Sequence, residues 1–196
     1  MTITAVILAG GRGTRMGGVE KGLLDWRGRP LIAHLIDALA PQVDHILINA
    51  NRAHERYAIF GLPIIRDAPD FEGLGPLAGI HAALSHAATE RVICVPCDMP
   101  ELPDNLVAKL LQATQAEPSR PPLAYAIATA RTYPTLSLLH RDYSGALAAS
   151  LHQGHCAAWR WLDEHGAIQV EFGDLPLANF NTPDALNLPC YKFGLN

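Results

Sequence analysis

Short apolar runs alternate with amphipathic segments along most of this chain, and the alternation predicts its secondary structure. Runs rich in β-branched residues, such as Ile3 to Leu8, are typical of buried strands. Segments with apolar residues at helical spacing separate them, as in the segment that Pro30 opens. Strands are predicted at residues 3–8, 45–49, 62–65, 91–97, 123–129, 134–139 and 167–172. Helices are predicted at residues 30–40, 54–60, 80–87, 102–115, 143–152 and 156–164, and a last one begins at Thr182.

The order of these elements predicts an α/β fold with a mainly parallel, Rossmann-like sheet and helices on both faces. The runs at 123–129 and 134–139 follow one another without a helix between them, which predicts a hairpin or an antiparallel edge strand. A length of 196 residues suits one domain over residues 1–196 with a large buried core.

Composition and charge narrow the class of protein. Apolar residues make up 49% of the chain and charged residues 17%, which argues against disorder. The net charge is −4 and no long basic run offsets it, so no nucleic acid partner is expected. No stretch approaches the roughly 18 consecutive apolar residues of a membrane span, and the N-terminus leads straight into a strand. We therefore expect a cytoplasmic protein that has no membrane partner.

Cys94 and Cys97 form a Cys-x-x-Cys pair, which can be interpreted as a redox or metal motif. The pair lies inside the apolar run at 91–97, where residues three apart point to opposite faces of a strand. The sequence has no second such pair to complete a zinc site. We expect two buried thiols instead.

The candidate chemistry begins in the glycine-rich segment from Leu8 to Lys21. Five of its fourteen residues are glycine, and it carries cations at Arg12, Arg15 and Lys21. Glycine lets successive backbone N–H groups converge on an anion, so the segment is expected to hold phosphate. The simpler interpretation is a tight connection after a strand. The segment fits neither the Walker A motif nor the dinucleotide fingerprint, because their characteristic Gly-Lys-Ser/Thr ending and third glycine are missing.

Polar residues mark the ends of three further strands. Asn49, Asp67 and Asp98 each lie at or just after the end of a predicted strand. Open α/β sheets bind ligands outside the carboxyl ends of their strands. A magnesium ion that carries phosphate oxygens would compensate the Asp98 carboxylate. The alternative role for Asp98 is to cap the helix predicted at 102–115.

A second glycine-rich turn runs from Gly73 to Gly79 and leads into a helix. It is either a nucleotide-site element or a device for close helix–sheet packing, which also requires small residues. His81 on this helix is interpreted as a surface or satisfied core histidine.

The segment Leu-Ala-Gly-Gly-x-x-x-Arg-Met-Gly-Gly-x-x-Lys, residues 8–21, resembles the signature of nucleotidyltransferases that use a nucleoside triphosphate. Within that group it is most similar to the molybdenum cofactor guanylyltransferases, although Glu20 stands where the family usually has aspartate. Matching elements extend from residue 3 to about 110 and return at Tyr133-Pro134-Thr135 and at 179–183. The resemblance implies a nucleotide-binding half over about 1–110 and an acceptor-binding half over about 111–196.

The resemblance also implies roles for individual residues. Arg15, Lys21 and Asp98 would act in catalysis, because groups that hold the β- and γ-phosphates stabilise the charge of departing pyrophosphate. The implied cofactor is Mg²⁺, bound by Asp98 and Asn181. The implied nucleotide-binding residues are Leu8, Ala9, Gly10, Gly11, Lys21, Asn49, Asp67 and Asp98.

The implied reaction joins the GMP moiety of GTP to the terminal phosphate of molybdenum-loaded molybdopterin and releases pyrophosphate. On the acceptor side the match is poorer: Tyr133 replaces a frequent histidine, and 154–160 lacks the relatives' basic Gly-x-Arg-Lys-like segment. Cofactor-delivery proteins or molybdoenzyme chaperones are the implied protein partners. The alternatives are a nucleotidyltransferase that uses CTP or acts on a sugar or polyol phosphate, and a protein that binds nucleotide or cofactor without turnover.

Overall fold

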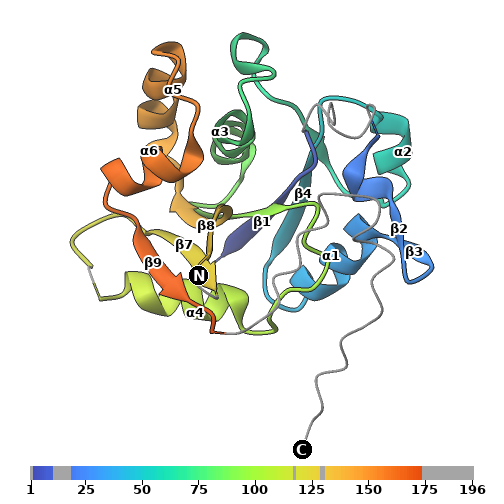
Figure 1. The fold of residues 1–196 in the computed structure, drawn as a ribbon, viewed down its shortest axis with the longest axis horizontal. Coiled ribbons are helices and arrows are strands. Elements are labelled where there is room, and N and C mark those ends of the chain that lie inside the picture. Colours follow the sequence, from blue (N-terminus) through green and yellow to red (C-terminus); the bar gives the residue numbers. More distant parts are fainter. Residues whose placement is uncertain (1, 11–18, 117, 129–130, 174–196) are drawn as a thin grey trace, which may run out of the picture.

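The computed structural model describes residues 2–10, 19–116, 118–128 and 131–173, and its centre is a seven-stranded sheet (Figure 1). The strands lie in the order β5-β4-β1-β6-β8-β7-β9. Their bounds are β1 Ile3–Leu8, β4 His45–Asn49, β5 Ile64–Ile65, β6 Arg91–Pro96, β7 Leu123–Ala128, β8 Arg131–His140 and β9 Ile168–Glu171. A separate two-stranded ribbon pairs β2 Asp25–Trp26 with β3 Arg29–Pro30.

Six α-helices occur in the described part of the chain. They are α1 Leu31–Leu39, α2 His54–Ala58, α3 Pro76–His86, α4 Leu106–Thr114, α5 Ser144–His152 and α6 Ala158–Glu164. Short 3₁₀ turns are η2 Lys21–Leu23, η3 Pro69–Phe71 and η4 Arg141–Tyr143. None of the helices among these described residues is long and apolar enough to cross a membrane.

Most predicted elements are present, and the main differences lie at helix starts. The helix predicted at 102–115 begins only at Leu106, whose N–H donates to the carbonyl of Pro103 in the preceding turn. Leu102 precedes this proline and is therefore disfavoured in helical conformation. The helix predicted from residue 80 begins earlier, at Pro76, whose fixed φ suits a first helical turn. The last predicted helix, at Thr182, lies outside the described residues.

The sheet is mainly parallel, as predicted. Strands β5, β4, β1 and β6 pair in parallel, and β9 pairs in parallel with β7. Strands β7 and β8 form the predicted antiparallel pair. The two alternatives predicted for this pair were a hairpin and an antiparallel edge strand; the hairpin is present, and β8 lies between β6 and β7. The edge on that side belongs to β9, because its residues add a further ladder beyond β7.

The ladder between β6 and β8 is short. It covers four residue pairs, from Arg91 opposite His140 to Cys94 opposite Ser137. Pro96 in β6 and Pro134 in β8 have no N–H to donate, so neither strand can extend a regular ladder at that end. The start of β8 pairs instead with β7, across an irregularity between Tyr125 and Ala126.

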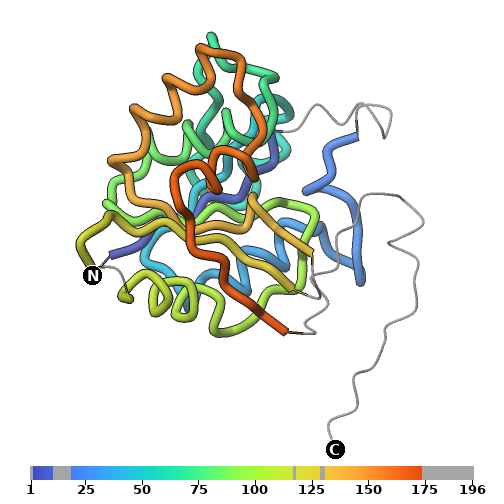
Figure 2. The backbone as a smooth tube through the Cα atoms, turned by 60° about the vertical axis from the view of Figure 1, so that its left-hand side comes forward, coloured from blue at the N-terminus to red at the C-terminus, as the bar shows by residue number. Residues whose placement is uncertain are grey.

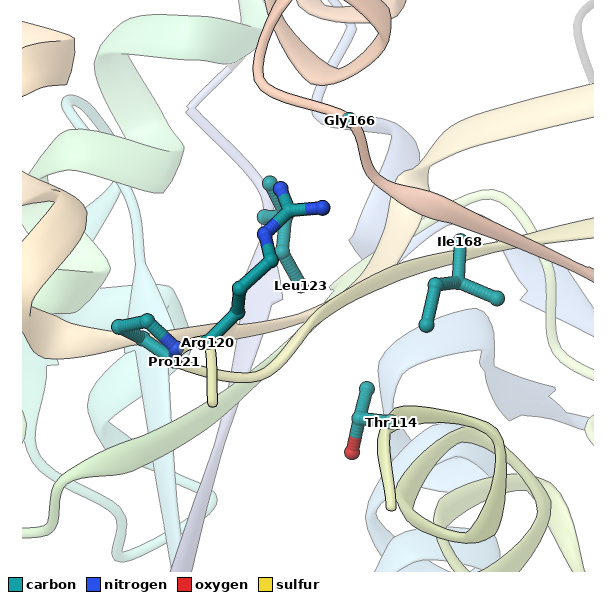
Figure 3. Close-up of a pocket in the computed structure, with 6 residues that line it drawn as sticks. All are labelled: Thr114, Arg120, Pro121, Leu123, Gly166 and Ile168. Atoms are coloured by element: carbon teal, nitrogen blue, oxygen red, sulfur yellow. The ribbon is translucent and has the colours of Figure 1, made fainter. Parts of the chain in front are cut away.

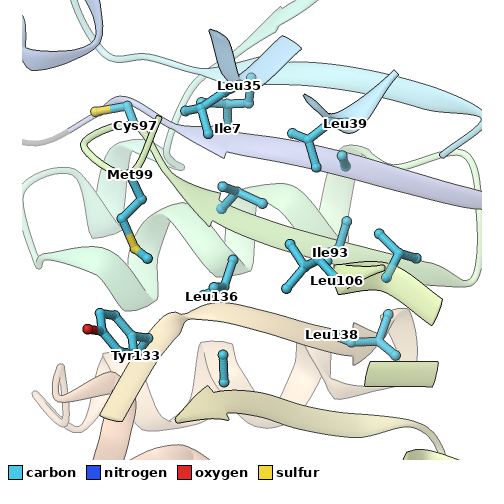
Figure 4. Packing of buried hydrophobic residues seen from close by; sticks show 14 of the residues in the cluster. Ile7, Leu35, Leu39, Ile93, Cys97, Met99, Leu106, Tyr133, Leu136 and Leu138 are labelled. Carbon is cyan, nitrogen blue, oxygen red and sulfur yellow. The ribbon is translucent and has the colours of Figure 1, made fainter. Parts of the chain in front are cut away.

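Two hydrophobic layers cover the sheet. Helices α3, α5 and α6 pack on one face, and α1 and α4 pack on the other (Figures 1 and 2). In the second layer, Leu35 and Leu39 of α1 and Leu106 of α4 lie against Ile7 and Ile93 of the central strands (Figure 4). All five side chains are fully buried. The parallel strands are therefore apolar on both faces, as a sheet between two helical layers requires.

Cys94 and Cys97 are buried free thiols, as predicted. Cys94 belongs to the layer of α3, α5 and α6, whereas Cys97 belongs to the layer of α1 and α4. Burial raises the pKa of both thiols, that of Cys97 to about 12, so neither is a thiolate at neutral pH. The redox interpretation of this pair is therefore not supported.

A pocket lies at the amino ends of β7 and β9, close to the end of α4 (Figure 3). Its lining residues are Thr114, Arg120, Pro121, Leu123, Gly166 and Ile168. The Arg120 guanidinium donates a hydrogen bond to the carbonyl of His165 there. Because β7 and β6 run in the same direction, this pocket is at the edge of the sheet opposite to the carboxyl ends of β1 and β6.

Candidate functional site

Four neighbouring parallel strands, β5, β4, β1 and β6, end at one edge of the sheet. Hydrogen bonds hold these ends together. The N–H of Ala9 donates to the carbonyl of Asn49 at 2.8 Å, and the N–H of Cys97 donates to the carbonyl of Leu8 at 3.2 Å. At or just beyond these strand ends lie the predicted residues Leu8, Ala9, Gly10, Asn49, Asp67 and Asp98.

Lys21 and Asp98 form an ion pair at this edge. The Lys21 Nζ lies 3.2 Å from Asp98 Oδ2, and the two side chains are 26% and 13% exposed. Lys21 begins η2, and Asp98 lies in the turn after β6. The N-cap position of α4 belongs to Asn105, so Asp98 does not cap that helix. The structure thus removes the alternative role that the sequence left open for Asp98.

Asp67 is held by the amides of two asparagines. Asn49 Nδ2 donates to Asp67 Oδ1 at 2.9 Å, and Asn51 Nδ2 donates to Asp67 Oδ2 at 2.7 Å. The backbone N–H of Asp67 donates in return to Asn51 Oδ1 at 2.9 Å. Asn51 Nδ2 also lies 3.3 Å from the carbonyl of Gly10. Both carboxylate oxygens of Asp67 are therefore fixed before any ligand binds.

The two glycine-rich segments meet at Asn49. A Cβ on Gly79 would lie 2.8 Å from Asn49 Oδ1, and a Cβ on Gly10 would lie 3.0 Å from the same atom. Asn49 itself is 1% exposed. Close packing of α3 on the strand ends is thus an observed reason for the glycine at 79. A direct nucleotide contact by the turn at 73–79 stays a prediction.

A second polar cluster, not predicted from the sequence, joins Glu20 to the turn after β4. Arg52 lies 2.9 Å from Glu20 Oε1, and the Tyr57 hydroxyl donates to Glu20 Oε2 at 3.4 Å. Burial raises the pKa of Tyr57, with smaller contributions from Cys97 and Glu20, so Tyr57 is a neutral donor. Glu20 therefore ties the chain before η2 to the turn after β4 and to α2.

Asn51 was not among the predicted site residues, although the sequence carries a signal for it. In extended chain, residues i and i+2 point to the same side, so Asn51 follows Asn49 on the side where Asp67 lies. The turn after β4 continues that alternation for one more residue pair. Asn51 and its partner Asp67 are 16 residues apart in the sequence, so a local pattern does not show that they pair.

His81 was predicted to be a surface or satisfied core histidine, and one of its ring nitrogens differs from that prediction. Its ring packs edge-on against Phe71, with ring centres 5.0 Å apart. Its Nδ1 is buried and has no hydrogen-bond partner among the residues that the structure describes. Burial, together with nearby His86, lowers the pKa of His81 and favours the neutral ring.

Magnesium fits the donors of this edge. Asp98 offers a partly exposed carboxylate beside a cation, and Mg²⁺ in phosphate-transfer sites takes one or two carboxylates together with phosphate oxygens. Three predicted site residues, Gly11, Arg15 and Asn181, lie outside the described residues, so their roles stay predictions.

A parallel sheet that gathers glycine-rich connections, a Lys–Asp pair and a fixed carboxylate at its carboxyl edge defines a nucleotide-binding α/β protein. The family model of the MobA-like NTP transferase domain matches residues 5–170. The chain therefore belongs to this family, within which its curated relatives are molybdenum cofactor guanylyltransferases. The family predicted from the glycine-rich segment is thus confirmed.

The relatives match over nearly their whole length. The chain is 43% identical to the molybdenum cofactor guanylyltransferase of Methylibium petroleiphilum, over 94% of this chain and 93% of that protein. It is 45% identical to the protein of the same name from Mannheimia succiniciproducens, over 96% and 99%.

Solved structures share the fold. The molybdopterin-guanine dinucleotide biosynthesis protein A of Archaeoglobus fulgidus aligns with a TM-score of 0.72 at 23% identity, over 95% of both chains. A 2-C-methyl-D-erythritol 4-phosphate cytidylyltransferase from Thermus thermophilus aligns with a TM-score of 0.68 at 17% identity, over 95% of this chain and 96% of that chain. At these identities the likeness concerns the fold alone.

Proposed function

We propose that this protein transfers the GMP moiety of GTP to the terminal phosphate of molybdenum-loaded molybdopterin, which forms the guanine dinucleotide of the cofactor and releases pyrophosphate. The observation that carries this proposal is the 43–45% identity to proteins named molybdenum cofactor guanylyltransferase, over almost the full length of both chains. The position of the implied GTP-binding residues Leu8, Ala9, Gly10, Lys21, Asn49, Asp67 and Asp98 at one edge of the sheet supports it. The reaction would take place in the cytoplasm.

The reaction needs no general base. An oxygen of the acceptor phosphate forms a bond to the α-phosphorus of GTP, while the bond from that phosphorus to the oxygen bridging to the β-phosphorus breaks. A phosphate monoester has a second pKa of about 6, so the acceptor is already mostly a dianion at neutral pH. The main obstacle is repulsion between two anions, which cationic groups reduce.

In this proposal, Lys21 and Asp98 deal with that charge, and their ion pair at the carboxyl edge of the sheet supports the assignment. Lys21 would bind phosphate oxygens of GTP and stabilise the charge on departing pyrophosphate, as Arg15 is predicted to do. Asp98 would hold Mg²⁺, with Asn181 as the predicted second ligand. When bound, the ion supplies Lewis-acid polarisation of phosphate oxygens. Asn49 at the end of β4 and Asp67 after β5 would bind the nucleoside part of GTP.

Pyrophosphate release tests the proposal. Purified protein is assayed with each of GTP, CTP, ATP and UTP, with and without Mg²⁺ and molybdenum-loaded molybdopterin. We expect release only with GTP, metal and acceptor together. Release with CTP, or with a sugar or polyol phosphate as acceptor, would assign the protein to another nucleotidyltransferase class. Tight GTP binding without release under any of these conditions would indicate a binding protein.

A further inference from the structure

Asn51 uses its whole carboxamide to connect three strand ends. Its Oδ1 accepts from the Asp67 backbone N–H at 2.9 Å, and its Nδ2 donates to Asp67 Oδ2 at 2.7 Å. The same Nδ2 faces the carbonyl of Gly10 at 3.3 Å. Asn51 follows β4, Asp67 follows β5 and Gly10 follows β1. One side chain thus joins the first glycine-rich segment to the carboxylate two strands away.

We propose that Asn51 is a positioning residue for GTP: it orients the Asp67 carboxylate so that this group can accept two hydrogen bonds from the nucleoside. The inference rests on the proposed function, because it takes GTP as the nucleotide. Asn51 acts through Asp67 and Gly10 and takes no part in the bond changes at phosphorus.

The hydrogen-bond capacity of Asp67 supports this role. An ionised carboxylate has about four lone-pair positions. Asn49 and Asn51 occupy one position on each oxygen, which leaves each oxygen able to accept one bond more. Asp67 is only partly buried, so a ligand can reach it. Two acceptors at fixed positions suit a ligand with two adjacent donors.

Two parts of GTP present adjacent donors. The guanine edge offers N1–H and the 2-amino group, and the ribose offers its 2′- and 3′-hydroxyls. Both would be recognised by the same carboxylate chemistry. Inosine triphosphate lacks the 2-amino group and 2′-deoxyGTP lacks one hydroxyl, so the two analogues distinguish the sources.

The alanine and aspartate variants at this position separate positioning from catalysis. In Asn51→Ala the Asp67 carboxylate loses one of its two amide donors. In Asn51→Asp a second carboxylate replaces that donor at a contact of 2.7 Å, with little change of shape. We expect the Kd of GTP to rise about 10- to 100-fold, which is the usual size of losing a hydrogen bond to a charged group. We expect kcat at saturating GTP to stay within about threefold, since Lys21 and Asp98 are untouched.

Three further measurements exclude a merely structural role. Thermal melting reports folding, and Asn105→Ala removes an exposed asparagine with no side-chain cap bond as a matched control. The wild type should discriminate against one of the two analogues, and Asn51→Ala should lose most of that preference. GTP binding by Asn51→Asp, relative to wild type, should recover as the pH falls from 8 to 5.5. At low pH one of the two facing carboxyls takes up a proton and again donates to the other.

The other charged and titratable groups around this turn include Glu20, Arg52, His54 and Arg66, and His81 interacts electrostatically with Asp67. They are present in the wild type and in the variant, so they cancel in the ratio of the two affinities. Acid recovery in Asn51→Asp alone is therefore specific to the facing carboxyls.

The outcomes separate this inference from the proposed function. Weaker GTP binding in both variants, with kcat retained, the analogue preference lost and acid recovery in Asn51→Asp, would support it. GTP binding by the variants at wild-type strength, or a loss of kcat and of melting temperature in parallel with affinity, would overturn it alone. A wild-type chain that does not bind GTP would overturn the proposed function and this inference together.

Discussion

At the β1–β6 end of the site, Lys21 and Asp98 meet through an ion pair between partly exposed side chains. At the β4–β5 end, Asn49 and Asn51 share three hydrogen bonds with Asp67: both amides donate to its carboxylate, and its backbone N–H donates to Asn51. Asn49 is 1% exposed. The first arrangement is a single contact between two opposite charges. The second joins two amides to one carboxylate through several hydrogen bonds. We therefore expect Lys21 and Asp98 to change contact partners when substrates bind, whereas the groups around Asp67 keep their geometry.

This difference predicts separate roles for the Lys21–Asp98 pair and for the groups around Asp67. A single ion pair holds each of its groups by one contact, so Lys21 and Asp98 can rearrange around phosphate and metal. Several hydrogen bonds that converge on one carboxylate hold its orientation more firmly. Substitutions at the first end should therefore lower kcat, and substitutions at the second end should weaken nucleotide binding.

Replacing Asp98 should have the largest effect. Asp98→Asn keeps the shape of the side chain but removes the charge that would hold Mg²⁺, so kcat should fall roughly 10²- to 10³-fold. GTP binding without metal should change little. Steady-state pyrophosphate release and metal titration measure the two quantities. Asp104→Asn, an exposed carboxylate before α4, is the matched control. Normal turnover by Asp98→Asn would remove this residue from the metal site.

Lys21→Ala should come next. It removes a cation from the phosphate end, so both the KM for GTP and kcat should worsen, with kcat/KM about 10²-fold lower. Lys109→Ala is the control, because it deletes the same charge from α4, where the lysine lies over the Phe172 ring. If only KM changed, Lys21 would bind the ground state without stabilising the departing pyrophosphate.

Gly79→Ala tests the packing at the other end. The new Cβ would lie 2.8 Å from Asn49 Oδ1, so Asn49 or α3 must shift, which costs about 1–3 kcal/mol. We expect lower thermal stability and about tenfold weaker GTP binding, with kcat retained. Gly145→Ala in α5 meets nothing within 4 Å and should be neutral or stabilising. Equal melting temperatures for the two variants would contradict this account of the glycine at 79.

Glu20→Gln should have the smallest effect. It removes the charge that pairs with Arg52 but keeps an oxygen for the Tyr57 hydroxyl. The Glu20 side chain is 9% exposed and that of Arg52 is 46% exposed, so we expect a change in stability of about 1 kcal/mol. The KM for GTP should rise by no more than about threefold, because Glu20 only anchors the chain that leads to Lys21. Chemical denaturation and GTP titration check both values. A loss as large as that of Lys21→Ala would place Glu20 in the phosphate site itself.

The positions of many residues implied to bind GTP could be predicted, because the sequence signals for them are local. Glycine-rich segments, strand ends and isolated carboxylates can be recognised in a few consecutive residues, as Asp98 and the segment from Leu8 were. The contacts that organise these groups are not local. Asn51 and Asp67 follow two neighbouring strands and are 16 residues apart in the sequence. Glu20 and Arg52 are separated in the sequence by α1 and β4.

The position of the antiparallel strand was also beyond local pattern. The sequence showed that two strands follow each other without a helix, but the edge of the sheet was decided by where β9 pairs. Pro103 disfavours a helical conformation at Leu102, although the apolar spacing includes that residue, and α4 starts at Leu106. Long-range pairing and single proline constraints therefore account for most differences.

The short ladder between β6 and β8 has a consequence for substitutions in the sheet. Four residue pairs join the strands that end at the candidate site, β5, β4, β1 and β6, to the antiparallel strand β8. The ladders among β5, β4, β1 and β6 do not include β8, β7 or β9. A change of strand pairing beyond β8 would therefore leave the backbone pairing that places Asn49 and Asp98 intact.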